Sequence, residues 1–102
     1  MAARGVLRVG EGGRLLFWCP GCDGAHQVQV GGGPGPRWGF NGDYDRPTFT
    51  PSVLVRMPDP DRPGTDIQRC HSFVRDGQIQ FLGDCTHALA GHTVALKPFD
   101  EA

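Results

Sequence analysis

The chain has 102 residues, a formal net charge of −1 and 38% apolar residues. This length predicts one small domain over residues 1–102. The balanced charge, without a Lys or Arg cluster, disfavours nucleic-acid binding, which relies on neutralising phosphates. No apolar run reaches the roughly 18 residues of a membrane span, so we expect no membrane partner.

Short strands separated by turns dominate the first half of the chain. Residues 6–9 and 14–18 flank the turn-rich sequence "GEGG" and predict a first hairpin, which leads directly into "CPGC". Residues 26–30 alternate between polar and apolar side chains, the pattern of a half-buried strand. A further strand is predicted at residues 52–55.

The stretch "CHSFVRDGQIQFLGDCTH", residues 70–87, predicts the best-defined element. Its central Asp-Gly pair is a strong signal for a two-residue hairpin turn. Because side chains alternate along a strand, Cys70 and Cys85 are expected on one face of this hairpin, and His71 and Asp84 on the other. Residues 86–91 could add a single helical turn, and residues 92–96 a closing strand.

Four cysteines are the first candidates for chemistry. The N-terminus lacks the apolar stretch of a secretion signal, so we expect a cytoplasmic protein, where thiols bind metals more often than they form disulfides. Cys19 and Cys22 have the spacing of a metal-binding knuckle, and Cys70 and Cys85 share a hairpin face. These four thiols predict a Zn²⁺ site that joins the two halves of the chain. The fold class expected is therefore mainly β, a small zinc-ribbon-like antiparallel domain with little helix.

Histidines next to the cysteines leave other sites open. His71 and His87 are alternative or second-site zinc ligands, and a mixed site could join Cys19 and Cys22 with His26, His71 or His87 in place of one thiol. An open catalytic zinc would need about three protein ligands and a water, which His71, His87 and either Asp84 or Cys85 could supply, with Asp84 as the proton acceptor. The candidate catalytic residues are thus His71, Asp84 and His87.

A nucleophilic mechanism is also open. Cys85 could act as a thiolate with His71 or His87 as its base. Ser52 could act as a nucleophile only beside a base, which the sequence does not locate. A redox function for "CPGC" is disfavoured because no helix follows it.

The chain resembles a family of small bacterial and phage proteins that has been labelled a domain of unknown function and sometimes misnamed ammonia monooxygenase. The motifs that carry the resemblance are "CPGC" (19–22), "NGDYDRPTFTPS" (41–52), "CHSFVRDGQIQFLGDCTH" (70–87) and "ALAGHTVAL" (88–96). Some members are encoded beside bacterial ubiquitin-like proteins and their E1- and E2-like enzymes.

The resemblance implies a peptidase that trims or releases a ubiquitin-like modifier, with catalysis at the two Cys-His clusters. The residues alone leave a second hypothesis open, a non-catalytic zinc-ribbon module that binds a protein partner. Neither the zinc-metalloprotease motif HExxH nor a papain-type cysteine motif is present, so a peptidase mechanism would be an unusual one.

Overall fold

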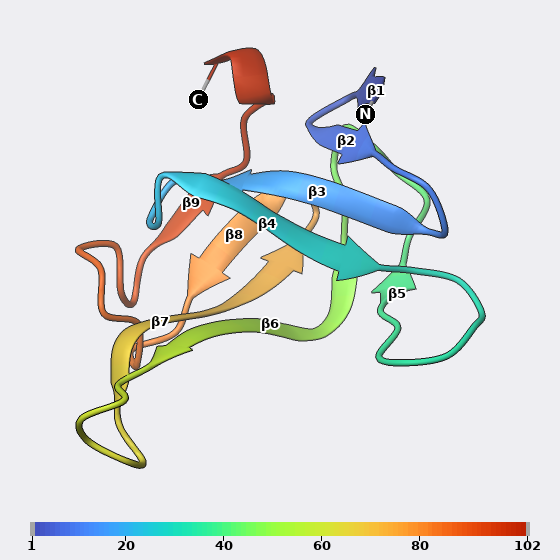
Figure 1. Cartoon of the computed structure of the whole chain (residues 1–102). Helices are drawn as coiled ribbons and strands as arrows, with labels where there is room; N and C mark the ends of the chain where they lie inside the picture. The colour runs from blue at the N-terminus through green and yellow to red at the C-terminus, as the bar shows by residue number, and fades with distance from the viewer. Residues whose placement is uncertain (1, 102) are drawn as a thin grey trace.

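The computed structural model describes residues 2–101, which form two antiparallel β-sheets (Figure 1). The first sheet has the strand order β1-β2-β3-β4, with β1 (Ala2–Arg4), β2 (Leu7–Val9), β3 (Arg14–Cys19) and β4 (Gly24–Gln29). The second has the order β5-β6-β7-β8-β9, with β5 (Gly39–Phe40), β6 (Phe49–Pro58), β7 (Asp66–Arg75), β8 (Gln78–Phe81) and β9 (Thr93–Ala95). Within each sheet, every strand is hydrogen-bonded to the next one along the chain, so both sheets are meanders.

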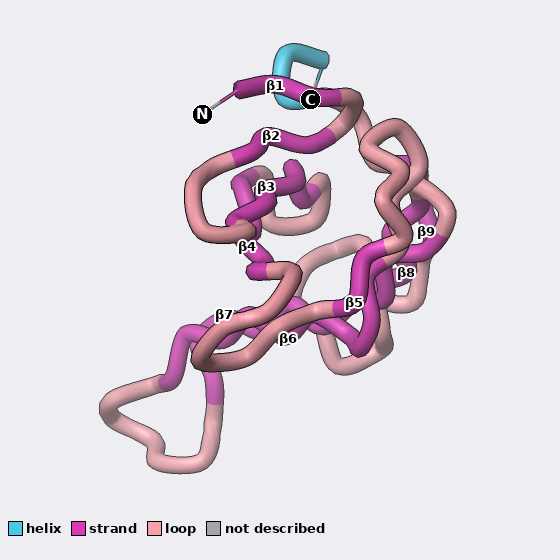
Figure 2. The backbone as a smooth tube through the Cα atoms, turned by 90° about the vertical axis from the view of Figure 1, so that its right-hand side faces the viewer, coloured by secondary structure: helices cyan, strands magenta, loops and turns pink. Residues whose placement is uncertain are grey.

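The hydrophobic core lies between the two sheets, which Figure 2 shows as separate layers. The side chains of β3 alternate regularly between half-buried and buried positions, and the buried ones are Leu15, Phe17 and Cys19. The Phe17 ring stacks on Phe49 of β6 with a centroid distance of 6.1 Å, which joins the layers. The burial of alternate side chains in β3 is the pattern expected of a strand that lies against a core on one face.

The predicted hairpin is confirmed in its register between Ser72 and Phe81, where the strand pairing ends. Val74 pairs with Ile79, and the turn residues Asp76 and Gly77 have φ angles of 50° and 75°. Positive φ at both positions is what a tight type I′ connection requires, and Gly adopts it without steric cost. Strand β7 continues well before Cys70 and pairs with β6 in a long hairpin that projects at the lower left of Figure 1.

The helical turn expected at residues 86–91 is not formed. The Ala90 amide donates to the His87 carbonyl at 3.3 Å, and the His92 amide to the Leu89 carbonyl at 2.9 Å, which is a pair of successive turns. The Thr86 side chain does not cap a helix, because its hydroxyl accepts a hydrogen bond from the Arg69 amide at 3.0 Å. This contact fastens the segment to β7 instead.

Helical structure within residues 2–101 is limited to a 3₁₀ turn, η1 (Phe99–Glu101), so the mainly β class is confirmed at this level. None of it has the length and apolar character needed to cross a lipid bilayer.

Candidate active site and metal centre

Two groups of functional side chains lie on opposite faces of β7. Cys70 is buried and points into the space between the sheets, whereas its neighbour His71 lies on the outer face. This division follows from the alternation of side chains along an extended strand. One strand therefore contributes to both groups.

The inner group is a cluster of three thiols and an imidazole from Cys19, Cys22, Cys70 and His87. The four potential ligand atoms all lie within 4.8 Å of one another. The Sγ atoms of Cys19 and Cys70 are 3.7 Å apart, and the Cys70 Sγ is 3.5 Å from the His87 Nε2. Segments far apart in the sequence thus converge at one point.

The local backbone explains how the cluster is assembled. The Cys22 amide donates to the Cys19 Sγ at 3.4 Å, as expected for a knuckle. Gly21 lies so close to His87 that a Cβ atom at this position would overlap the imidazole ring. On its other side, the ring packs edge-on against Phe81 with a centroid distance of 4.5 Å. The imidazole is therefore held in a slot that only Gly leaves open.

The three thiols differ in pKa because they are buried beside one another. A hydrogen bond with Cys70 lowers the pKa of Cys19 to about 4. Burial raises the pKa of Cys22 to about 11, and the hydrogen bond with Cys19, together with burial, raises the pKa of Cys70 well above its usual range. The cluster by itself therefore accommodates one negative charge, whereas a divalent cation would stabilise three thiolates.

This donor set fits a metal such as zinc, because three soft sulfurs and one imidazole nitrogen are a standard tetrahedral combination. His87 occupies the position that the four-thiol interpretation gave to Cys85. The Cys85 thiol lies instead 3.2 Å from both the amide nitrogen and the carbonyl oxygen of His71. A mixed site with His87 in place of one thiol was among the predicted alternatives, and the cluster has this composition. His26, another candidate for the mixed site, is buried in β4 and interacts with Cys19, but it is not one of the four residues whose ligand atoms lie within 4.8 Å of one another.

The outer group consists of Ser52, His71 and Asp84. The Ser52 Oγ is 2.9 Å from the His71 Nε2, and the His71 Nδ1 is 3.3 Å from the Asp84 Oδ2. In the tautomer with its proton on Nδ1, His71 donates to Asp84 and accepts from the Ser52 hydroxyl. A hydroxyl, an imidazole and a carboxylate in this order form a nucleophile, its base and the group that orients the base.

Backbone contacts hold the three side chains in place. The Leu82 amide and the Cys85 thiol both donate to the His71 carbonyl, at 2.9 and 3.2 Å. The turn from Leu82 to Cys85 brings Asp84 beside the His71 ring. On the other side, the Trp38 indole donates to the Ser52 carbonyl at 3.2 Å. Each member of the group is therefore fixed by its own neighbours.

The structure places the predicted residues as follows. His71 and Asp84 are in contact, as their shared face suggests, whereas His87 lies on the inner side with the thiols. The sequence alone does not indicate the contact between Ser52 and His71, because that contact depends on the register between β6 and β7. Leu54 pairs with His71 in that register, so Ser52 and His71 share the outer face as diagonal neighbours.

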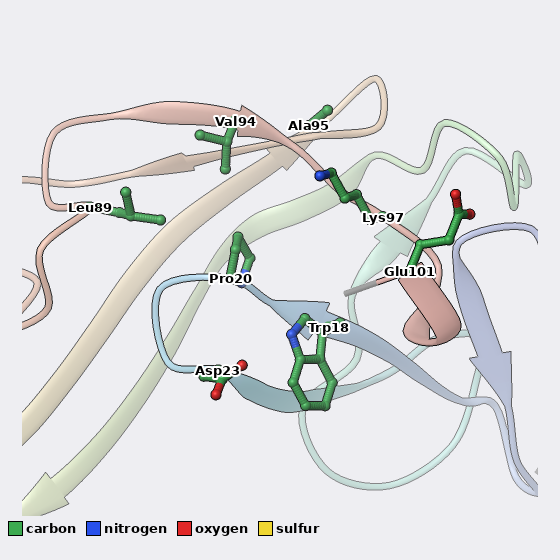
Figure 3. Close-up of a pocket in the computed structure, with 8 residues that line it drawn as sticks. All are labelled: Trp18, Pro20, Asp23, Leu89, Val94, Ala95, Lys97 and Glu101. Carbon is green, nitrogen blue, oxygen red and sulfur yellow. The ribbon is translucent and has the colours of Figure 1, made fainter.

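A separate apolar hollow of about 360 Å³ adjoins the knuckle, and Figure 3 shows Trp18, Leu89 and Val94 among the residues that line it. The polar side chains in its lining are Asp23, Lys97 and Glu101. No serine, cysteine or histidine lines it, so the hollow lacks the hydroxyl and imidazole groups that Ser52 of β6 and His71 of β7 supply to the outer group.

Comparison with known proteins adds one finding. A protein-family model described as "Bacterial ubiquitination-like system serine protease (BubE)" matches residues 1–82. The matched range contains Ser52 and His71 and ends shortly before Asp84 and His87. No curated protein and no solved structure matches the chain. The match confirms the resemblance to a family linked to bacterial ubiquitin-like systems.

Proposed function

Because the chain belongs to the BubE family of bacterial ubiquitination-like system serine proteases, we propose that it is a peptidase with Ser52 as its nucleophile. The observation that carries the proposal is the 2.9 Å contact between the Ser52 Oγ and the His71 Nε2. His71 acts as the base, and Asp84, at 3.3 Å from the Nδ1, holds the ring in the tautomer that can accept a proton.

In the proposed reaction, the Ser52 Oγ attacks the carbonyl carbon of the scissile bond and transfers its proton to the His71 Nε2. His71 then gives this proton to the leaving amine as the carbon–nitrogen bond breaks, and an acyl-enzyme forms. A water molecule repeats the sequence, losing its proton to His71 and releasing the carboxylic acid. Ser52 recovers its proton in the last step.

We further propose that the inner cluster holds Zn²⁺ as a structural centre. Cys19, Cys22, Cys70 and His87 would fill all four tetrahedral positions, which is the arrangement of structural rather than catalytic zinc sites. Bound zinc would supply a cross-link between the knuckle, β7 and the segment after β8. With zinc bound at this centre, residues 1–102 would form a single zinc-binding domain that resembles a zinc ribbon.

The substrate class follows from the family. Its role in a ubiquitination-like system implies protein partners. We propose that the protein processes or deconjugates a ubiquitin-like modifier, so that the scissile bond is a peptide or isopeptide bond at the end of that modifier. The open position of Asp84 and the partial exposure of His71, 25% for its side chain, are compatible with a polypeptide substrate.

The test uses the ubiquitin-like precursor encoded in the same genome as substrate and a fluorophosphonate as a probe of the nucleophile. We expect Ser52→Ala to abolish labelling and to lower kcat by at least about 10³-fold, as loss of a triad nucleophile does. Ser72→Ala is the matched control, because Ser72 lies on β7, is fully buried and has no hydrogen-bond partner for its hydroxyl.

Two outcomes would point to the other hypotheses. Cleavage by Ser52→Ala that depends on His71 and His87 would favour a zinc hydrolase with the catalytic set His71, Asp84 and His87. Absence of both cleavage and labelling in the zinc-loaded protein would favour the non-catalytic module that binds a protein partner.

A further inference from the structure

The outer edge of β6 is unpaired beside the triad. Strand β5 pairs with β6 only at Phe49 and Thr50, whereas β7 pairs with the opposite edge as far as Pro58. Within residues 2–101, no other strand adjoins β6 on the β5 side. The Trp38 indole donates to the carbonyl of Ser52, the proposed nucleophile, so the open part of this edge begins after Ser52.

The backbone groups that face this edge can be identified from β7. The carbonyls of His71 and Arg69 accept hydrogen bonds from Leu82 and Thr86, so they point toward β8 and away from β6. In an antiparallel pair, the residue opposite such a position also points away. Leu54 and Arg56 lie opposite His71 and Arg69 and therefore present their N–H and C=O groups to the open edge.

Apolar side chains gather on the same arm of the molecule. The large hydrophobic residues exposed among the described residues are Leu54, Val55, Met57 and Ile67, all on β6 and β7. Leu54 shares the outer face with Ser52 and His71. Val55 and Met57 lie on the inner face, where they line a groove of about 270 Å³ beneath β4. Both faces beside the open edge can thus receive uncharged side chains.

We propose that an extended segment of the polypeptide substrate binds as an added strand along β6 and pairs with Leu54 and Arg56. Backbone pairing supplies affinity in strand addition, and the alternating side chains of the added strand meet the two apolar surfaces. The added strand delivers a carbonyl to Ser52 from the side opposite His71. The inference rests on the proposed function and defines its substrate as an unfolded, apolar tail rather than a folded surface.

Hydrogen exchange in the Ser52→Ala variant tests this binding mode without turnover. The probe is a synthetic peptide that spans the cleavage point of the ubiquitin-like precursor from the same genome. We expect the peptide to slow exchange at the Leu54 and Arg56 amides by about tenfold or more. Exchange at Val55 is the internal control, because this amide points toward β7 and should not respond.

A pair of variants provides a second measurement. Leu54→Ala removes the side chain but keeps the amide, whereas Leu54→Pro also removes the donor and is tolerated where an edge N–H faces solvent. We expect Leu54→Pro to raise KM about fivefold relative to Leu54→Ala, as loss of one hydrogen bond would.

Peptide binding that leaves the Leu54 and Arg56 amides unaffected, or that protects a terminal strand such as β4 instead, would overturn the inference. So would equal KM values for the two variants. Fluorophosphonate labelling of the wild-type chain reports on Ser52 without the peptide, so failure of the triad and failure of the edge are separate results.

Discussion

Substitution of Gly21 by Ala tests the geometry of the thiol and imidazole cluster. A Cβ atom at this position would lie 2.7 Å from the His87 Nδ1 and closer still to two other ring atoms. The ring cannot retreat, because Phe81 packs against it at 4.5 Å and the Leu89 amide donates to the Nδ1 at 3.2 Å. Gly21→Ala must therefore displace a proposed metal ligand without changing any donor atom.

The expected cost follows from the nature of the change. Disturbing the orientation of a ligand weakens metal binding by about 10- to 100-fold, which corresponds to about 1.4–2.7 kcal/mol. Because binding to a structural site is coupled to folding, the free energy of unfolding of the zinc-loaded chain should fall by a similar amount. Competition with a zinc-responsive dye measures the first quantity, and urea unfolding at fixed free zinc measures the second.

Gly24→Ala is the matched control for Gly21→Ala. Gly24 also lies beside the knuckle, but the nearest heavy atom to a Cβ there is the Cys22 carbonyl oxygen at 3.9 Å, an ordinary contact. The Gly24→Ala variant should therefore retain wild-type zinc affinity. If Gly21→Ala binds zinc as tightly as this control, the slot that holds His87 has no role in metal binding and our description of the centre is incorrect.

Three further predictions concern other parts of the molecule. Cys19→Ala should remove a metal ligand and severely destabilise the fold, and a cooperative thermal transition at the wild-type temperature would contradict this. Cys85→Ala should lower kcat about 10- to 100-fold by loosening the backbone of His71. Cys85→Ser should retain activity because a hydroxyl can make the same contacts. Equal kcat values for the two variants would show that the Cys85 thiol does not position His71. The hydrogen bond from Arg56 holds the pKa of Asp66 below its usual value of 3.8, so this carboxylate stabilises the fold at neutral pH and loses that contribution as the pH falls through its folded-state pKa. Urea unfolding at a series of acidic pH values should show a weaker pH dependence for Asp66→Asn, and an unchanged acid limb would disprove the assignment.

Local signals were sufficient to predict much of the fold. The Asp76–Gly77 pair specifies a tight turn because both positions adopt positive φ, and the register of β7 and β8 follows from it. The contact between His71 and Asp84 lies beyond this strand pairing and depends on the turn from Leu82 to Cys85. The thiol knuckle could also be predicted, because the Pro-Gly pair between Cys19 and Cys22 bends the backbone so that the two thiols converge.

Contacts between distant segments could not be predicted in the same way. His87 reaches the thiols because the chain forms successive turns after Cys85, and neither turn has a strong sequence signal. Ser52 meets His71 through the pairing of β6 with β7, whose register is interrupted by irregularities between Phe49 and Val53 and again after Met57. A shift by one residue would have sent Ser52 to the opposite face, so periodicity alone does not select the nucleophile.

The adjacency of Cys70 and His71 on one strand affects how inhibition should be interpreted. If Zn²⁺ occupies the proposed centre and is then removed, β7 should lose its anchor on one face, and the proposed base, His71, should be displaced on the other. Under the proposed mechanism, a chelating agent would then abolish proteolysis without the ion taking part in bond cleavage, and the protein would be mistaken for a metallopeptidase. In inhibitor profiling of such proteins, sensitivity to EDTA should therefore be interpreted as loss of folded structure. Sensitivity to serine-directed reagents is the result that identifies the mechanism.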